Sequence, residues 1–427
     1  MKTTPLWTDQ HPRPGDLPTH PLPEEVDVAI VGGGYTGLNA ARVIARNGGS
    51  VAVLEQETIG WGASSRNGGM TTTGLKAAAK VVNERYGKQM GRDFWQASLD
   101  AIDLVEEIVH EEQIDCDFER RGHVALATKP QHYKQMQAKA NWFRRELDHH
   151  MEAIGPDELR REIGSDVFYG GLRDETSGGL NPAKYVFGLA QAVARYGACL
   201  CENACVTDIS RQNGRFQLRV SAGDGATGLV RAREVLLATN GYTGGLLRGV
   251  KRRIFPVGSY IVVTEPLPPA LRQELSPNGR MFYTSRWFLH YFRLTADGRV
   301  LFGGRNNLST GLDLHDSAQR LRRSLVHVFP QLQDVPITHS WSGRLGLTFD
   351  LMPHIGRVDG VHYAMGYCGH GVSIATYLGT EAGLLLSGQK QSSPFAQIDH
   401  DTKFFYQGRP WFLPLAAAYY RFLDWIS

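Results

Sequence analysis

The sequence has little cysteine, little excess charge and no long apolar run. Its five cysteines are an odd number without a C-x-x-C pair, which favours free thiols in a reducing, cytoplasmic compartment over a disulfide framework. No segment reaches the roughly 20 apolar residues of a bilayer span, so no integral membrane segment is expected. Acids and bases are interspersed around a net charge of +3, which argues against a nucleic-acid partner. No H-E-x-x-H or similar spacing predicts a metal site.

The two ends of the printed sequence carry weaker signals. The Pro-rich residues 5–23 lack a basic region followed by an apolar core, so we expect no secretory signal there. Residues 411–426 are amphipathic and aromatic. We expect them to dock as a helix on their own domain, with contact to a membrane surface as the alternative.

A glycine turn near the start of the chain is the most informative pattern. Residues 26–55 run as strand, glycine turn, helix, strand and acid, which is the context of a dinucleotide-binding fingerprint. Gly32 allows the tight turn, Gly34 lets the backbone approach a pyrophosphate, and Gly37 lets the helix pack closely on the strand. The free N–H groups at the helix N-terminus favour phosphate. Glu55 is placed to accept hydrogen bonds from ribose hydroxyls.

A second stretch, residues 223–228, fits the same glycine spacing with different flanks. Alternating apolar residues precede it and another strand-like stretch follows, without a helix. This pattern predicts the loop of a β-hairpin. We therefore expect one dinucleotide site in the chain.

Two further loops are expected at a ligand. Residues 60–70 follow Glu55 and consist mostly of small and hydroxyl side chains with one arginine, which suits wrapping a phosphate and lying flat against a ring. The Gly-rich residues 366–371 lead into a helix predicted over residues 372–385, whose N-terminus would stabilise negative charge. His370 either serves as a catalytic base or shapes this turn.

An aromatic strand is predicted over residues 287–294. Period-two spacing puts Trp287, Tyr291 and Arg293 on one face and Phe292 on the other, without deciding which face meets a ligand. Trp287, Tyr291, Arg293 and His370 are the candidate catalytic residues. Either Arg293 or Arg305 is a candidate to bind a substrate carboxylate through a bidentate contact.

The order of these patterns predicts an α/β fold with an α+β second domain. A discontinuous Rossmann-like domain is expected over residues 1–76, 166–249 and 338–427. A substrate domain with a mixed, largely antiparallel sheet is expected to interrupt it at residues 77–165 and 250–337. Asp297-Gly298 marks a hairpin turn within the second of these segments.

Six motifs occur in an order that resembles a known family. They are the fingerprint, the loop GASSRNGG at residues 62–69, ATNG at 238–241, WSG at 341–343, DLMPHIG at 350–356 and GHGV at 369–372. The chain resembles the FAD-dependent amine and D-amino-acid oxidases, which include sarcosine and glycine oxidases. Trp7 in the Pro-rich leader, the SSRNGG loop and the tail PWFLP are similar to bacterial gamma-glutamylputrescine and related gamma-glutamyl-polyamine oxidases.

The resemblance implies FAD as cofactor, hydride transfer to flavin N5 and a small amine substrate. Members of the narrower group use O2 to convert a primary amine to an aldehyde, ammonia and H2O2 in polyamine catabolism. We expect a monomer or homodimer and non-covalent FAD, because residues 344–349 lack cysteine and the early loop ends in Met70 rather than histidine. The resemblance assigns FAD contacts to Gly32, Gly34, Tyr35, Thr36, Gly37, Glu55, Gln56, Gly62, Ala63, Ser64, Ser65, Arg66, Asn67, Gly68, Gly69, Val206, Asn240, Gly241, Gly343, Gly369, His370, Gly371 and Val372.

Several alternatives stay open. The substrate is a gamma-glutamylated amine, or an N-methyl or small amino acid as in sarcosine and glycine oxidases. An NADPH-dependent flavoprotein and a flavin-binding protein without turnover are the other classes, although a single dinucleotide site favours electrons taken from the substrate. Residues 301–305 hold no counterpart of the lysine that activates oxygen in monomeric sarcosine oxidases, so a quinone also stays open as acceptor.

Overall fold

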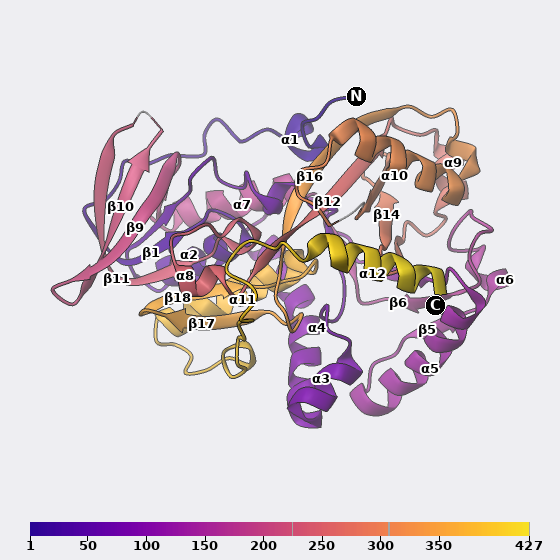
Figure 1. The fold of residues 1–427 in the computed structure, drawn as a ribbon. Helices are drawn as coiled ribbons and strands as arrows, with labels where there is room; N and C mark the ends of the chain where they lie inside the picture. The colour runs from indigo at the N-terminus through magenta and orange to yellow at the C-terminus, as the bar shows by residue number, and fades with distance from the viewer. Residues whose placement is uncertain (224, 306–307, 427) are drawn as a thin grey trace.

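The computed structural model describes residues 1–223, 225–305 and 308–426, which form two eight-stranded sheets lying side by side (Figure 1). The first sheet has the order β17-β18-β11-β1-β2-β8, and β9 and β10 extend it beside β11. Its strands are β1 (Glu25–Val31), β2 (Val51–Leu54), β8 (Cys199–Cys201), β9 (Ala204–Gln212), β10 (Arg215–Ala222), β11 (Thr227–Leu237), β17 (His354–Val358) and β18 (Val361–Met365).

The centre of the first sheet is parallel and buried on both faces. β1 pairs in parallel with β2 and β11, and β2 pairs in parallel with β8. Val28 and Ile30 enter the apolar cluster on one face, whereas Ala29 and Val31 enter the cluster on the other. Burial on both faces explains why this strand is apolar almost throughout.

The predicted hairpin at the second glycine stretch is confirmed. β10 and β11 pair antiparallel on either side of it, although Asp224 itself lies outside the described residues. No helix begins among the described residues of this stretch, which therefore do not form a second dinucleotide turn.

Helices cover the face of the first sheet that carries Val28 and Ile30. α2 follows the glycine turn, and α11 crosses α2 at close range. A Cβ on Gly379 of α11 would lie 2.4 Å from the carbonyl oxygen of Thr36 in α2. Glycine at this position lets the two helix axes approach each other. The larger helices on this side are α2 (Tyr35–Arg46), α4 (Lys88–Glu111), α7 (Pro182–Arg195) and α11 (Gly371–Leu386).

The second sheet is antiparallel except for one parallel pair, β4 with β13. Its order is β16-β12-β15-β14-β13-β4-β6-β5, and stacked Phe282, Phe292 and Phe302 form part of its core. Its strands are β4 (His123–Leu126), β5 (Glu152–Ile154), β6 (Gly171–Asp174), β12 (Phe255–Thr264), β13 (Met281–Thr284), β14 (His290–Leu294), β15 (Val300–Gly304) and β16 (Ile337–Leu347).

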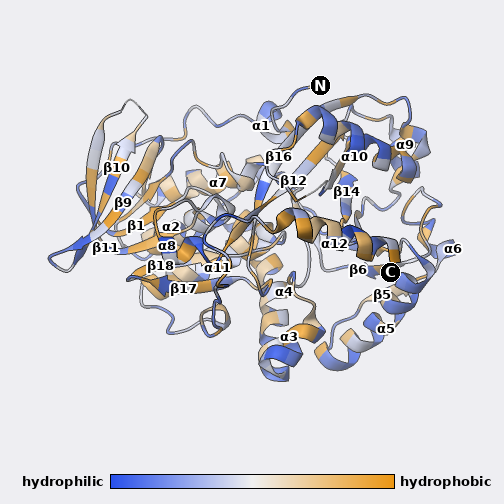
Figure 2. Ribbon diagram, in the orientation of Figure 1, coloured by the Kyte–Doolittle hydropathy of each residue, from blue (hydrophilic) through white to orange (hydrophobic). Residues whose placement is uncertain are grey.

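The remaining elements surround the two sheets. Figure 2 shows that hydrophilic and hydrophobic residues alternate along many of them. None of the helices formed by the described residues has the length and apolar content needed to span a bilayer. These elements are α1 (Leu6–Gln10), α3 (Ala79–Tyr86), α5 (Pro130–Leu147), α6 (Pro156–Leu159), α8 (Arg248–Lys251), α9 (Pro269–Leu275), α10 (Leu314–Val328), α12 (Leu413–Ile426), β3 (Met70–Thr71), β7 (Gly178–Gly179) and the 3-10 turns η1 (Ala63–Ser65), η2 (Asn240–Tyr242), η3 (Pro330–Leu332) and η4 (Pro394–Ala396).

The predicted aromatic strand is shorter than expected. β14 begins at His290, because the backbone N–H groups of Trp287 and Phe288 donate to the carboxylate of Asp424 in α12, at 2.7 and 3.0 Å, instead of pairing with a strand. From His290 onward the period of two holds. Phe292 faces the core of the second sheet, and Tyr291 faces the opposite side.

The α/β fold class with an antiparallel second sheet is as predicted. The domain boundaries stay a prediction. Strands β6 and β16 belong to the second sheet, although they fall within or overlap segments that the expected boundaries place with the first.

Candidate active site

A cavity of about 1130 Å³ lies where the carboxyl ends of β1, β2 and β11 meet the second sheet. Ligands of doubly wound sheets bind at this edge of the strands. Residues from both sheets line the cavity. One end is formed by the glycine turn and Glu55 of the first sheet, and the other by side chains of the second sheet, including Tyr291, and by Arg305.

The glycine turn at β1 is formed by close backbone packing. Gly32 has a φ of +112°, which favours glycine. A Cβ on Gly37 would lie 2.0 Å from the carbonyl oxygen of Gly32, so the first turn of α2 lies directly against the end of β1. α2 begins without a side-chain cap at Gly34. Its N-terminus therefore presents a positive dipole end to the cavity, which suits a phosphate.

Glu55 lies beside this turn. Its Oε2 accepts a hydrogen bond from the Gly33 N–H at 2.7 Å, and its Oε1 accepts one from the Glu57 N–H at 3.0 Å. Burial raises the pKa of this carboxyl group, and the two hydrogen bonds oppose that shift. Glu55 thus fixes the turn and also lines the cavity.

The small-residue loop after Glu55 is held by hydrogen bonds from its own Asn67 and from two tryptophans outside it. The Asn67 side-chain amide donates to the carbonyl oxygens of Ala63 and Ser64 at 3.1 and 3.0 Å. The indole N–H of Trp7, from α1, donates to the Asn67 carbonyl at 2.8 Å. The indole N–H of Trp341, from β16, donates to the Arg66 carbonyl at 2.9 Å. The loop is therefore a fixed wall of the cavity.

The Gly-rich loop near the other end of the chain leads into α11, which begins at Gly371. Its N-cap residue, His370, makes no side-chain cap. The Nδ1 atom of His370 is buried and has no hydrogen-bond partner among the described residues. Burial and the nearby Lys76 and Arg305 lower the pKa of His370 to about 3, so its imidazole is neutral at pH 7.

Aromatic side chains line the end of the cavity next to the second sheet. The Tyr291 hydroxyl lies 3.1 Å from the Ser259 hydroxyl, and Tyr283 and Leu289 lie on the same wall. Gly303 has no room for a Cβ, which would lie 2.2 Å from the Tyr291 ring. Burial raises the pKa of Tyr291, so its hydroxyl stays protonated at neutral pH.

Lys76 and Arg305 both line the cavity at this end, and neither forms an ion pair with a carboxylate among the described residues. Lys139 lines the cavity as well, and like the other two it lowers the pKa of His370. Burial and the neighbouring Arg305 lower the pKa of Lys76 to about 8, and burial also lowers the pKa of Arg305. The only acids among the described lining residues, Glu55 and Glu57, belong to the fingerprint end. Sequence reasoning had named Arg305 as an alternative and had missed Lys76, since no motif surrounds it.

Most predicted site residues meet at this cavity. Those that line it are Gly32, Gly34, Tyr35, Thr36, Glu55, Gln56, Gly62, Ala63, Ser64, Arg66, Asn67, Gly68, Val206, Asn240, Tyr291, Gly343, Gly369, His370, Gly371 and Val372. Those outside its lining are Gly37, Ser65, Gly69, Gly241, Arg293 and Trp287.

Two predicted catalytic side chains are thus placed elsewhere. The Arg293 guanidinium is used internally, because it donates to the carbonyl oxygens of Gly68 and Leu180 at 2.8 and 2.6 Å. Trp287 is half exposed and stacks on Tyr420 of α12, with 5.2 Å between ring centroids. Of the two arginines predicted to bind a substrate carboxylate, Arg305 therefore lines the cavity and Arg293 does not.

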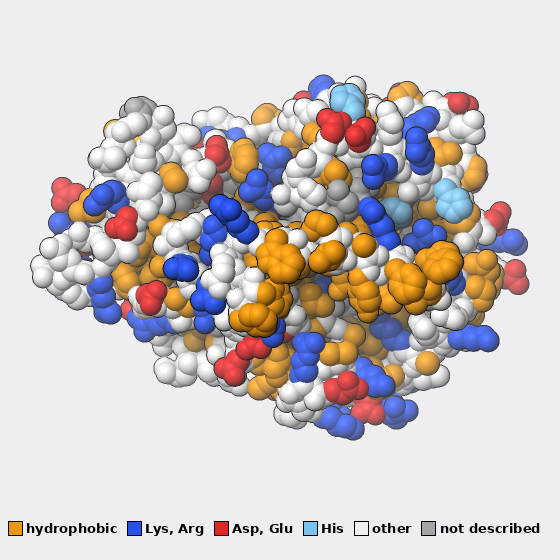
Figure 3. All heavy atoms as spheres, viewed as in Figure 1, with side chains coloured by type: hydrophobic (Ala, Val, Ile, Leu, Met, Phe, Trp, Pro, Cys, Tyr) orange, Lys and Arg blue, Asp and Glu red, His pale blue; other side chains and the backbone are white. Residues whose placement is uncertain are grey.

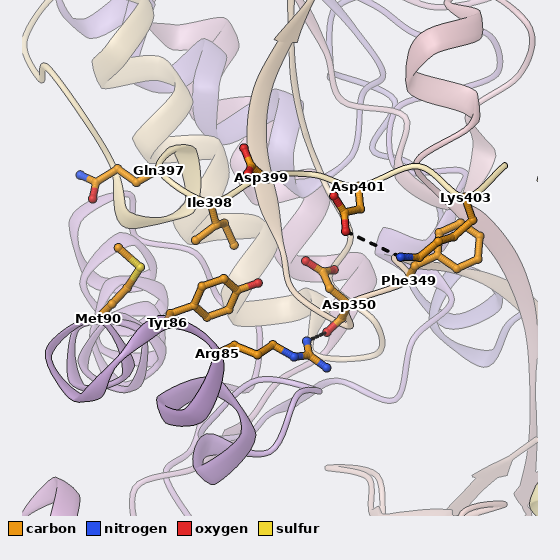
Figure 4. A pocket seen from close by; sticks show the side chains of 10 residues that line it. All are labelled: Arg85, Tyr86, Met90, Phe349, Asp350, Gln397, Ile398, Asp399, Asp401 and Lys403. Carbon is orange, nitrogen blue, oxygen red and sulfur yellow. Dashed lines mark hydrogen bonds and ion pairs between the residues drawn. The ribbon is translucent and has the colours of Figure 1, made fainter.

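A second hollow of about 620 Å³ lies on the surface between α3 and the segment after η4 (Figure 4). Its charges oppose one another. The Arg85 guanidinium donates to the Asp350 carbonyl at 2.7 Å, and Lys403 lies 3.7 Å from the Asp401 carboxylate. It contains none of the predicted site residues, so we do not take it as the active site.

Comparison with known proteins decides the family. Residues 27–383 match the family described as FAD dependent oxidoreductase, abbreviated DAO. The chain belongs to this family. As a DAO-family protein it is an FAD-dependent oxidoreductase, in agreement with the cofactor predicted from the sequence.

Relatives match over almost the full chain. Gamma-glutamylputrescine oxidoreductase of Escherichia coli is 33% identical over 405 residues, covering 93% of this chain and 92% of the relative. A probable oxidoreductase, OrdL, of Haemophilus influenzae is 31% identical over 411 residues, covering 94% and 92%. Glycine oxidase from Geobacillus kaustophilus shares the fold, with a TM-score of 0.73 and 21% identity over 89% of this chain and 100% of that one.

The cavity of this DAO-family chain fits FAD. The N-terminus of α2, where the Ser64 hydroxyl accepts from the Tyr35 N–H at 3.0 Å, and the small-residue loop suit the diphosphate. Glu55 suits a ribose. The uncapped N-terminus of α11 and the partnerless Nδ1 of His370 offer polar groups to the ring system. When bound, the flavin supplies a two-electron acceptor.

Proposed function

We propose that this protein oxidises the primary amine of a gamma-glutamylated diamine or polyamine, with gamma-glutamylputrescine as the first candidate. The amine, O2 and water would give the aldehyde, ammonia and H2O2, within polyamine catabolism. The C–H hydrogen would leave with two electrons to the flavin, and water would then replace the nitrogen of the resulting imine. O2 would take up the electrons as H2O2.

The observation that carries this proposal is that two cations, Lys76 and Arg305, lie near each other at the aromatic end of the cavity. Two cations without a carboxylate partner among the described residues suit an anionic group on the substrate. A gamma-glutamyl group carries such a carboxylate, whereas a free diamine carries only positive charge. The 33% identity to an enzyme named for gamma-glutamylputrescine supports the same choice.

The aromatic wall has a separate task. An alkylammonium titrates near 10, so its deprotonation at pH 7 costs about 4 kcal/mol. A cavity wall of Tyr283, Leu289 and Tyr291 disfavours the charged amine and lowers that cost without a dedicated base. Tyr291 would also orient the amine through its hydroxyl, and neutral His370 would accept or donate one hydrogen bond at the ring system.

An anaerobic titration of the holoenzyme tests the proposal. The flavin absorbance should bleach with gamma-glutamylputrescine, and air should restore it with one H2O2 per amine oxidised. Putrescine, sarcosine, glycine and NADPH serve as the comparison set. Bleaching only with sarcosine or glycine would replace the proposal with the small-amino-acid alternative, and bleaching only with NADPH would replace the reaction class. Reoxidation by a quinone but not by O2 would overturn the acceptor alone.

The variant Arg305→Gln tests the carboxylate contact. We expect kcat/KM for gamma-glutamylputrescine to fall about 10- to 100-fold, the value of a lost charge-assisted contact, with kcat changed less than KM. The slow oxidation of putrescine, which has no carboxylate, should change little. Equal losses on both substrates would show that Arg305 does not read the carboxylate. Arg299→Gln is the matched control, because that arginine pairs with Asp297 away from the cavity.

A further inference from the structure

The C-terminal helix α12 carries a second apolar face that points into solvent. Leu415 is 68% exposed, Tyr419 59% and Phe422 54%, at a spacing of four and three residues that puts them on one stripe. Trp425 at the end of the helix and Trp411 before its start extend the stripe. Figure 3 shows hydrophobic side chains in a row over α12, across one face of the molecule, with Lys and Arg side chains beside them. We call this stripe the aromatic row.

Docking of α12 on its own protein does not use the aromatic row. The inward face buries Leu413 and Ala417 in an apolar cluster with Phe255 and Cys368. The far end of the helix is fixed as well, since the Lys129 ammonium donates to the carbonyl oxygens of Asp424 and Trp425 at 2.9 and 3.2 Å. The helix is thus held in place with its outer stripe exposed, and the sequence-based expectation of a docked helix explains only one of its two faces.

The exposed charges of the segment that carries the aromatic row have one sign. Between residues 404 and 426 the charged side chains are Arg409, Arg421 and Asp424. Both arginines are exposed, and the Arg421 guanidinium also lies 5.5 Å from the centre of the Phe288 ring. The Asp424 carboxylate accepts the backbone N–H groups of Trp287 and Phe288. Residues 404–426, all of them described, thus carry exposed aromatic and arginine side chains and no exposed acid, which complements a surface that is apolar below and anionic above.

We propose that the aromatic row binds the surface of an anionic lipid bilayer, with α12 lying in the headgroup region parallel to the membrane plane. Trp and Tyr are the residues enriched at this depth, where their rings meet acyl chains and their polar atoms meet water. A second copy of the chain could also cover this apolar stripe, but the contact would bring the arginines of the two copies, which have the same charge, close together. The bilayer therefore suits the charge of this face better than self-association does.

This membrane contact would lie beside the cavity. α12 shares its apolar cluster with the cavity residue Cys368, and the Tyr420 hydroxyl is near enough to Arg305 to influence the pKa of that guanidinium. Membrane binding through α12 would be the same whichever amine the enzyme oxidises.

Vesicle co-sedimentation of the FAD-loaded protein tests the proposal. The protein should bind vesicles of phosphatidylcholine with phosphatidylglycerol, bind pure phosphatidylcholine more weakly, and lose affinity as salt rises. The double variant Leu415→Ser/Phe422→Ser should bind the anionic vesicles at least about tenfold more weakly. Arg409→Gln and Arg421→Gln should each weaken binding about fivefold.

The matched control is Tyr169→Ser/Leu229→Ser, which removes two side chains of similar exposure outside α12 and should bind as the parent does. Flavin absorbance and Tm show whether each variant is folded. Failure of the folded parent protein to bind anionic vesicles would overturn the proposal. So would a dimer in sedimentation velocity that Leu415→Ser/Phe422→Ser dissociates while vesicle binding stays absent, since the occupant would then be a second copy. Trp425 gives an independent readout, because lipids with brominated acyl chains should quench its fluorescence.

Discussion

At the residue level, the chemistry of the cavity depends on pairs of side chains far apart in the sequence. Lys76 follows the small-residue loop and Arg305 follows β15, yet each affects the pKa of His370. Two neighbouring cations repel each other and favour loss of a proton from the weaker one. Lys76 is the weaker one, with a pKa of about 8 against an ordinary value of 10.5.

This shift predicts a pH dependence of anion binding. Lys76 is charged below pH 8 and loses its charge as pH rises through about 8. We expect the Kd of a carboxylate inhibitor without an amine, such as glutarate, to rise as pH increases from 7 to 9, by about five- to tenfold. Flavin absorbance changes measure this Kd without turnover.

The variant Lys76→Met separates Lys76 from other titrating groups. Its Kd for glutarate should be high at pH 7 and nearly flat up to pH 9, because Lys76 no longer titrates and Arg305 stays charged over this range. Lys80→Met is the control, since Lys80 is exposed and outside the cavity. An unchanged slope in Lys76→Met would assign the titration to another residue.

At the level of elements, the contact between β1 and α2 leaves no space at Gly37. The variant Gly37→Ala places a Cβ 2.0 Å from the Gly32 carbonyl oxygen and 3.1 Å from a methyl group of Ile30. Although alanine favours a helix by about 1 kcal/mol, the turn must open, and we expect FAD affinity to fall at least tenfold. Fluorescence titration of the apoprotein with FAD measures this. Gly15→Ala, which meets no atom within 4 Å, should bind FAD as the parent does.

Three helices are joined by one buried carboxylate. Glu112, just after α4, accepts from the Arg42 Nε of α2 at 2.5 Å and from Arg195 of α7 at 3.0 Å. The variant Glu112→Ala removes the partner of the Nε atom of the buried Arg42 guanidinium, which keeps its second partner Glu111. The lost charge-assisted hydrogen bonds should cost about 1.5–3 kcal/mol. Urea unfolding followed by tryptophan fluorescence should show this loss. Glu119→Ala removes an exposed pair with Arg121 and should cost less than about 1 kcal/mol.

The elements that sequence patterns predicted well are those formed by local interactions. The strand, turn and helix around Gly32 and Gly37 depend on neighbours within the same 30 residues, and they occur within a few residues of the predicted bounds. The strand predicted from Trp287 failed in its first three residues because Asp424, far along the chain, takes the backbone N–H groups that a strand would use. The place of Lys76 in the cavity was likewise unpredictable, because only the assembled sheets bring it to Arg305.

At the level of the whole molecule, the two sheets are assembled from interleaved segments. β4 and β13 pair in parallel across more than a hundred residues of chain, and β11 pairs with both β1 and β18. The sequence predicted this interruption of one sheet by another from the alternation of its patterns. The exact division between domains could not follow from it, since β16 runs along β12 for its whole length.

The mode of FAD attachment is a prediction for the intact protein. Met70, Cys368 and His370 line the cavity, and the Cys368 thiol is engaged with Thr348 and the Gly366 carbonyl. Burial raises the pKa of this thiol, so it is a poor nucleophile toward a flavin. We expect acid precipitation to leave all FAD in the supernatant and a colourless pellet. Yellow protein after precipitation, with a peptide mass increased by that of FAD, would contradict this.

The first ten residues pack against the small-residue loop of the cavity and hold it in place. Leu6 and Trp7 are completely or almost completely buried, Trp7 holds the Asn67 carbonyl, and Lys2 adds backbone pairing to the edge of β16. Trimming this end for crystallisation, or fusing a bulky purification handle directly to it, would therefore release a wall of the cavity rather than a loose tail. Preparations altered in this way should be paler, because they would lose their yellow pigment during dialysis.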